Sequence, residues 1–143
     1  MMKPFRHEKD VKREVKKLLE RHGWFWWMPP ANAFGRSGIS DFHALRAGVF
    51  LAIETKVRNN KPTPMQAGFL ASVRVEDGFG FCVSEAQLEH LAAWFAAFDR
   101  SVAATRKGGQ PSNEDGSIML NAIIELTRDK DAHPPGDKVQ RSK

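Results

Sequence analysis

The sequence predicts an α/β fold: a mixed β-sheet flanked by helices, in the order α-β-β-β-α-β-α, followed by a C-terminal tail with one short helix. Two observations predict this class. Apolar residues recur at helical spacing in some segments, whereas short apolar runs rich in aromatic or β-branched residues lie between turn signals in others. The chain of 143 residues is 41% hydrophobic and 27% charged, which is enough apolar material for one core.

The N-terminal segment 7–22 has the pattern of an amphipathic helix, and Gly23 is suited to end it. Lysines and arginines occupy most of its circumference, and its apolar stripe is Val11, Val15, Leu18 and Leu19. The run WFWWM at 24–28 follows as a short aromatic strand, which Pro29 and Pro30 stop.

Two further strands are expected to form a hairpin. The segments DFHAL (41–45) and VFLAIETKV (49–57) flank the turn-like residues RAG, after a loop rich in small residues. A turn-rich connection, RNNKPTP, then leads to the second helix.

Two capping-box patterns place the remaining helices. In TPMQ, Thr63 is the N-cap, Pro64 is the first helical residue and Gln66 is the partner three positions after the cap. This helix is predicted to run to about Val75, and EDGFGFCV supplies a turn and the fourth strand. SEAQ repeats the capping pattern from Ser84 and begins a helix whose apolar stripe is Leu88, Leu91, Ala92, Phe95 and Phe98.

Composition divides the chain into a core domain at residues 1–100, a polar linker at 101–117 and a C-terminal part at 118–143. The linker prediction rests on the polar, Gly- and Ser-rich run SVAATRKGGQPSNEDG. The apolar residues of SIMLNAIIELTRD predict one short helix, which is not stable alone and docks on this body or on a partner chain. The final residues are expected to form a flexible basic tail.

Charge and cysteine content narrow the class of protein. A formal charge of +5 and a pI near 9.6 favour a polyanionic partner, most simply nucleic acid. The single cysteine, Cys82, excludes an internal disulfide, and no CxxC or His/Cys cluster suggests zinc. We expect a cytoplasmic protein without a membrane partner, because the N-terminus lacks a secretory signal and the longest apolar run is too short to span a bilayer.

The stretch GVFLAIETKV places charge at the end of a segment that reads as a buried strand. Side chains alternate along a strand, so Glu54 and Lys56 lie on one face and Thr55 lies on the other. If Ala47 and Gly48 form a two-residue turn, Asp41 lies directly opposite Glu54. A three-residue turn would shift this register.

Two adjacent carboxylates repel each other unless a cation lies between them. Oxygen ligands favour a hard divalent ion, so the pair Asp41 and Glu54 predicts a Mg²⁺ site, with Mn²⁺ as a substitute. With phosphate oxygens in the open positions, such an ion stabilises developing charge and lowers the pKa of bound water. Lys56 would position that water or neutralise the phosphate.

Asp41 followed by Glu54-x-Lys56 resembles the PD-(D/E)xK nuclease superfamily. The surrounding elements are similar to its VRR-NUC type, whose small members are often phage-encoded; they are an early helical glutamate, the loop GRSGISD, IETK and KPTPMQ. The resemblance covers roughly residues 7–98, and Ser40 departs from it, because the family often has proline before the aspartate. It implies a restriction-endonuclease-like core and a Mg²⁺-dependent DNA endonuclease related to Holliday-junction resolvases.

The resemblance also implies roles for individual residues. Asp41 and Glu54 would bind the metal together with the backbone carbonyl of Thr55, Lys56 would be catalytic, and Gln66 would lie near the site as a further catalytic residue. The family uses an acidic residue of the first helix as well. On a helical wheel Glu8 falls within the buried stripe and Glu14 outside it, so Glu8 is favoured and Glu14 is the second candidate.

The substrate implied by the resemblance is branched or otherwise distorted DNA, of the Holliday-junction or flap kind, cleaved by a homodimer. Arg36 and Ser37 in the loop, and Arg58 and Lys61 after the charged strand, are the candidate DNA contacts. The rival classes are a non-catalytic nucleic-acid-binding module on the same fold and a small α/β interaction protein whose basic charge is incidental.

Each site residue also has a structural alternative. Glu54 and Lys56 would be an exposed edge pair, Asp41 a turn cap, Gln66 a capping-box residue only, and Glu8 a surface residue of a charged helix. For the aromatic run at 24–27, a place in the core or in a dimer interface is favoured over a platform for base stacking.

Overall fold

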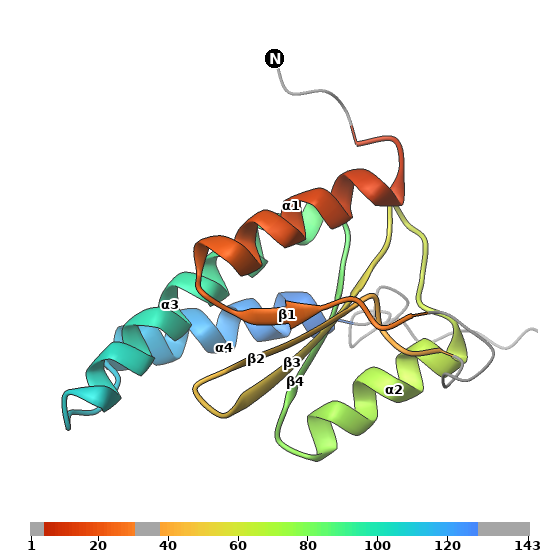
Figure 1. The fold of residues 1–143 in the computed structure, drawn as a ribbon. Helices are drawn as coiled ribbons and strands as arrows, with labels where there is room; N and C mark the ends of the chain where they lie inside the picture. The colour runs from red at the N-terminus through yellow and green to blue at the C-terminus, as the bar shows by residue number, and fades with distance from the viewer. Residues whose placement is uncertain (1–4, 31–37, 129–143) are drawn as a thin grey trace, which may run out of the picture.

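The computed structural model describes residues 5–30 and 38–128, and in this part of the chain it confirms the predicted α/β fold. Four helices and a four-stranded mixed sheet follow in the order α-β-β-β-α-β-α-α (Figure 1). The bounds are α1 Glu8–Arg21, β1 Phe25–Trp27, β2 Phe42–Arg46, β3 Val49–Thr55, α2 Pro64–Val75, β4 Phe79–Val83, α3 Leu88–Arg106 and α4 Asn113–Thr127. Within these ranges no helix has both the length and the apolar composition that crossing a membrane requires.

The strands lie in the order β1-β2-β3-β4, antiparallel except for the parallel pair β3–β4, which α2 connects. In the hairpin, Arg46 pairs with Val49, which confirms the two-residue turn at Ala47 and Gly48. Both turn residues have positive φ, 51° and 77°, as the tight turn that matches the strand twist requires. The register therefore continues toward Asp41 and Glu54 as predicted.

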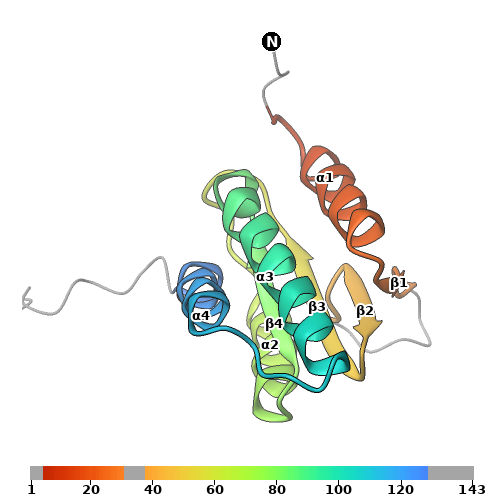
Figure 2. The same cartoon turned by 90° about the vertical axis from the view of Figure 1, so that its left-hand side faces the viewer.

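The two faces of the sheet are covered differently. One face packs against α1 and α3, where the buried apolar side chains form a single core (Figures 1 and 2). Trp94 and Phe95 of α3 lie at its centre, with Trp24 beside them. On the other face α2 lies over part of the sheet, where Phe69 stacks on His43. The aromatic run is thus divided, because Trp24 is buried while Phe25 is 70% exposed on the edge strand.

Both predicted capping boxes are present. The Thr63 hydroxyl accepts a hydrogen bond from the Gln66 N–H at 3.2 Å, and the Gln66 side-chain oxygen accepts one from the Thr63 N–H at 2.9 Å. The second box, at Ser84, begins with one 3₁₀ turn, Glu85–Gln87, before α3 starts. Gly23 has φ +71° and follows α1, which confirms its predicted role at the end of that helix.

The predicted linker at 101–117 is helical over most of its length. The first six residues continue α3 to Arg106, because Ala and Arg favour a helix interior. The polar run NEDG forms the first turn of α4, capped by Ser112, whose hydroxyl accepts from the Asp115 N–H at 3.0 Å. The connection that remains spans residues 107–112. The tail beyond residue 128 lies outside the described residues.

The C-terminal helix α4 docks on this body. Its buried residues Ala122 and Leu126 belong to the core of the domain. An ion pair between Arg100 Nε of α3 and Asp115 Oδ1, 2.6 Å apart, also links the two helices. The helix beside α3 in Figure 2 thus completes the layer on this side of the sheet.

Candidate metal centre

Two carboxylates meet where β2 begins and β3 ends. Asp41 directly precedes β2, and its N–H donates to Glu54 Oε2 at 3.2 Å. Asp41 Oδ2 accepts from both the N–H of Thr55, at 2.9 Å, and its hydroxyl, at 2.7 Å. This confirms that Asp41 lies opposite Glu54, and the two bonds from Thr55 hold the Asp41 carboxylate across the strand end instead of capping a local turn.

Glu54 is more enclosed than the strand pattern indicated. Its exposed fraction is 1%. The alternative of an exposed edge pair is therefore wrong for Glu54. Lys56 is half-buried, and its N–H continues the pairing with β4 by donating to the Val83 carbonyl at 2.9 Å.

A third carboxylate comes from the first residue of α1. Glu8, Asp41 and Glu54 each place one oxygen so that the three atoms lie within 4.8 Å of one another. Glu14, the second candidate, instead forms an ion pair with Lys17 at 3.1 Å and lines a cavity between α1 and α3. The structure thus brings Glu8 to the acidic pair and not Glu14, although the Glu8 side chain is 40% exposed and not buried as its place on the helical wheel predicted. We call Glu8, Asp41 and Glu54 the acidic group.

Burial and repulsion disfavour the charge on Glu54. Desolvation, followed by the nearby Asp41 carboxylate, raises the pKa of Glu54 to about 7, although Lys56 acts in the opposite direction. Desolvation lowers the pKa of Lys56, but attraction to Glu54, Glu8 and Asp41 outweighs it, so the net direction is upward. The lysine stays charged, yet it does not by itself compensate the carboxylates.

Two lysines border the acidic group. Lys56 Nζ lies 3.3 Å from Glu54 Oε1 and 3.7 Å from Glu8 Oε1. Lys12 Nζ lies 3.5 Å from Asp41 Oδ1. The sequence analysis did not identify Lys12 as a site residue. The available signal was its position four residues after Glu8, which puts both side chains on one face of α1.

The acidic group fits a hard divalent cation. All three side chains offer oxygen, which Mg²⁺, Mn²⁺ and Ca²⁺ prefer over nitrogen and sulfur. Oxygens bound to one such ion at 2.0–2.6 Å are separated by at most about 4–5 Å. The spacing within 4.8 Å is of this size, and the raised pKa of Glu54 is what an uncompensated ligand would show.

Gly38, three residues before Asp41, lies against the start of α2. Gly38 has φ +77°, and a Cβ there would come within 2.5 Å of the Met65 Cβ. Glycine is therefore required both for the conformation and for the close approach. Gln66 lies in this first turn, but its side-chain oxygen is used in the capping box, so its catalytic role stays a prediction.

The structure describes two of the four candidate DNA contacts. Arg36 and Ser37 fall outside the described residues. Arg58 is exposed, and its N–H donates to both carboxylate oxygens of Glu85, at 2.8 and 2.9 Å. Lys61 is exposed on the same connection between β3 and α2. Thr55 is placed by its own hydrogen bonds to Asp41, and a metal bond from its carbonyl stays a prediction.

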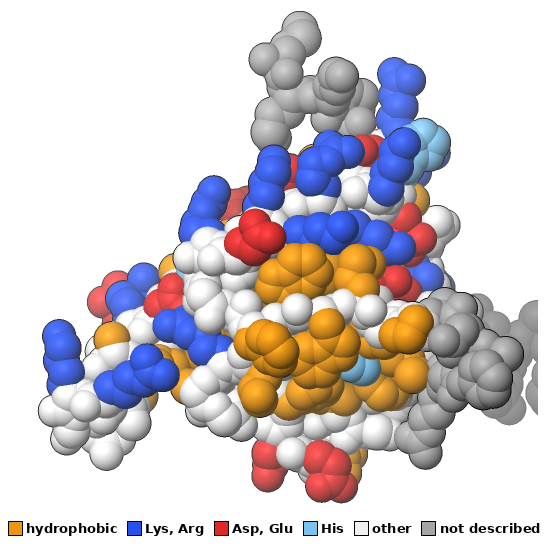
Figure 3. Space-filling view, viewed as in Figure 1, with side chains coloured by type: hydrophobic (Ala, Val, Ile, Leu, Met, Phe, Trp, Pro, Cys, Tyr) orange, Lys and Arg blue, Asp and Glu red, His pale blue; other side chains and the backbone are white. Residues whose placement is uncertain are grey.

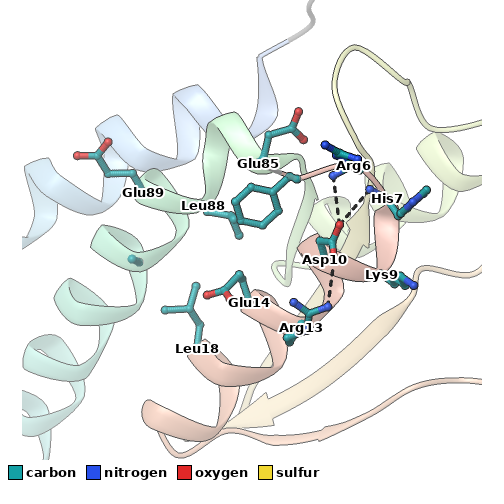
Figure 4. Close-up of a pocket in the computed structure, with 12 residues that line it drawn as sticks. Arg6, His7, Lys9, Asp10, Arg13, Glu14, Leu18, Glu85, Leu88 and Glu89 are labelled. Carbon is teal, nitrogen blue, oxygen red and sulfur yellow. Dashed lines mark hydrogen bonds and ion pairs between the residues drawn. The ribbon is translucent and has the colours of Figure 1, made fainter. Parts of the chain in front are cut away.

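A cavity of about 990 Å³ lies elsewhere, between α1 and the start of α3 (Figure 4). Leu18 and Leu88 point into it, and Asp10 at its rim accepts from Arg13 and from the N–H groups of Arg6 and His7. None of the acidic group lines this cavity. The candidate chemistry is therefore at the sheet end and not in this cavity.

No family model and no curated protein sequence matches the chain.

Proposed function

We propose that this protein is a Mg²⁺-dependent DNA endonuclease that hydrolyses phosphodiester bonds in branched or otherwise distorted DNA. The observation that supports it best is the acidic group beside Lys56, with three carboxylate oxygens within 4.8 Å and an ammonium 3.3 Å from Glu54. Mn²⁺ would substitute for Mg²⁺, because both take oxygen ligands.

In this proposal Glu8, Asp41 and Glu54 hold the ion, and the two hydrogen bonds from Thr55 keep Asp41 in place. When bound, the ion supplies Lewis-acid chemistry, which polarises a phosphate oxygen and makes water more acidic. Lys56 remains protonated and offers its ammonium to the charge that develops on the phosphate.

The charge around the site supports a polyanionic substrate. The protein carries a formal charge of +5, and α1, which supplies Glu8, exposes a row of lysines and arginines. Lys12 lies beside Asp41, where it would contact a phosphate next to the cleaved bond. Such contacts position the backbone without reading sequence, which agrees with a substrate recognised by shape.

The test is a cleavage assay with supercoiled plasmid and a four-way junction, in Mg²⁺ or in EDTA. We expect metal-dependent cutting by the wild type and a loss of at least about a hundredfold in Glu54→Gln and Lys56→Ala. Lys107→Ala, an exposed lysine after α3, is the matched control and should cut normally. Binding without cutting in either Mg²⁺ or Mn²⁺ would instead identify a non-catalytic nucleic-acid-binding module.

A further inference from the structure

The sheet face that α2 leaves open carries a set of aromatic and apolar side chains. The strand register places them together: Phe25 is opposite Leu45, Trp27 is opposite His43, and Leu45 is opposite Phe50. Phe25 is 70% exposed and Trp27 38% exposed, and Leu45 is also exposed. We call Phe25, Trp27, His43, Leu45, Phe50 and Phe69 the aromatic face. Figure 3 shows an apolar patch on the side of the molecule that carries β1.

The rings of this face touch one another. The ring centroids of Phe25 and Trp27 are 5.6 Å apart, and those of Trp27 and His43 are 5.7 Å apart. His43 in turn stacks on Phe69 of α2, with centroids 5.3 Å apart and planes 12° apart. A surface that is mostly ring edges and faces suits flat π-systems better than a flexible aliphatic partner.

The aromatic face adjoins one member of the acidic group, Glu54. Ala52 is paired with His43, and Glu54 lies two residues after Ala52 in β3. Side chains two residues apart in a strand point to the same face, about 6.5–7 Å from each other. Glu54 therefore lies on the same face as the rings, whereas Asp41 bonds through its carboxylate to Thr55 and Glu8 comes from α1.

The border of the face is positively charged. In Figure 3 a band of Lys and Arg side chains runs above the apolar patch, where α1 lies in Figure 1. The Lys and Arg residues of α1 are Lys9, Lys12, Arg13, Lys16, Lys17 and Arg21, and all are at least partly exposed. A second copy docked face to face would bring two such helices toward each other, which like charges disfavour.

Paired bases in an intact duplex present their edges in the grooves and hide their faces in the stack. Rings bordered by cations and placed next to a phosphodiester-cleaving site therefore match a strand whose bases are unpaired. We propose that the aromatic face binds unpaired bases of the substrate by stacking, so that the preferred DNA carries single-stranded nucleotides beside the cleaved bond. This inference rests on the proposed nuclease function and narrows its substrate to flap-like or splayed DNA.

Fluorescence anisotropy in EDTA tests the inference without cleavage. The probes are a labelled single strand, the same strand with every base removed, and a blunt duplex of equal length. We expect the base-bearing strand to bind about 5- to 100-fold more tightly than the abasic strand, because stacking is lost while the phosphates remain. If the wild-type protein binds both single strands with equal affinity, that result by itself overturns the inference.

Variants of the exposed rings locate the binding surface. Trp27→Ala and Phe25→Ala should reduce affinity for the base-bearing strand about 5- to 100-fold and leave the abasic strand unchanged, whereas Trp27→Phe should retain most of the affinity. Val75→Ala removes an exposed apolar side chain at the far end of α2 and is the control. Unchanged base-dependent binding in both alanine variants would overturn the proposal. So would a dimer in light scattering that these variants dissociate, because the face would then be an interface between copies.

The outcome separates this inference from the proposed function. Cutting of plasmid in Mg²⁺ without any preference for unpaired bases would leave the nuclease proposal intact and remove the stacking role. Base-dependent binding that both ring variants weaken, without cutting of any substrate, would retain the aromatic face as a binding surface and remove the nuclease proposal.

Discussion

At the scale of single residues, the burial of Glu54 beside the Asp41 carboxylate affects both the stability of the protein and its capacity to bind a cation. Burial and the Asp41 carboxylate raise the pKa of Glu54 to about 7, so near neutral pH this group is partly protonated. A cation brought to the acidic group would displace that proton, so metal binding and pH are coupled. The two hydrogen bonds from Thr55 hold the Asp41 carboxylate in place, and Gly38 allows the close approach to α2 just before Asp41.

Glu54→Gln should change how stability depends on pH. The folded-state pKa of Glu54, about 7, lies above the ordinary value of 4.5 for a glutamate, so the folded protein binds more protons and its free energy of unfolding falls as pH rises between these values. The shift corresponds to about 3 kcal/mol. In EDTA, the stability of Glu54→Gln relative to the wild type should therefore increase by up to that amount from pH 4.5 to pH 8.

Urea unfolding of both proteins at several pH values measures this difference. Burial also lowers the pKa of His43, which makes stability rise with pH toward 6.5, but this contribution is common to both proteins and cancels. A difference between the two proteins that stays constant from pH 4.5 to pH 8 would contradict the assignment of the shift to Glu54.

Gly38→Ala should destabilise the protein and weaken metal binding. The added Cβ would lie 2.5 Å from the Met65 Cβ, and the alanine would have to adopt φ +77°. We therefore expect the free energy of unfolding to fall by about 2–4 kcal/mol from overpacking and backbone strain together. Gly108→Ala is the matched control, with φ +81° and nothing within 4 Å of the Cβ, and should lose only about 1–2 kcal/mol. Urea unfolding and Mn²⁺ titration calorimetry measure both effects; equal losses in the two variants would show that the contact with α2 is unimportant.

At the scale of elements, helix ends and strand ends position the candidate site. α1 contributes its first residue, β2 and β3 contribute the residues at one end of the hairpin, and α2 supports the preceding loop through Gly38. The hairpin turn at the opposite end sets the register that brings Asp41 to Glu54. The site therefore depends on rigid elements, and α4 stabilises them from the side of the core.

Leu126→Ala tests whether α4 is part of the folding unit. Leu126 is buried in the core cluster, so its truncation should lower the free energy of unfolding of the whole domain by about 2–4 kcal/mol. Leu120 on the same helix is exposed, and Leu120→Ala should change it by less than about 0.5 kcal/mol. If α4 instead unfolds in a separate, earlier transition and Leu126→Ala leaves the unfolding of the remaining domain unchanged, α4 is an independent segment.

At the scale of the whole molecule, a small α/β domain combines an acidic group, two lysines beside it, a basic helix and an aromatic sheet face. A ligand that binds only the folded state stabilises it by mass action. Occupancy of the acidic group should therefore be measurable in the unfolding of the entire chain, without any assay of activity.

Thermal unfolding in Mn²⁺ or Mg²⁺ should show this linkage. At a concentration a hundred times the dissociation constant, the stabilisation is about 2.7 kcal/mol, and EDTA should reverse it. Glu8→Gln and Asp41→Asn should reduce or abolish the effect, whereas Glu14→Gln should retain it, because Glu14 pairs with Lys17 away from the acidic group. Equal stabilisation of the wild type and Asp41→Asn would show that the ion binds elsewhere.

Features with local causes were predictable. The capping boxes at Thr63 and Ser84 and the end of α1 at Gly23 depend on residues a few positions apart. The pairing of Asp41 with Glu54 was predictable as well, because a two-residue turn determines every pair along its hairpin. The polar start of α4 was read as a linker, since a capped first turn and a loop use the same residue types.

By itself the sequence determined the element order and the hairpin register, since these follow from chain geometry over short separations. Only the tertiary structure decided how far Glu54 is buried, that Lys12 borders Asp41 and that Trp24 enters the core while Trp27 stays at the surface. Those properties depend on which layer covers each face of the sheet. Packing between distant segments sets that covering, and the pattern within one segment does not contain it.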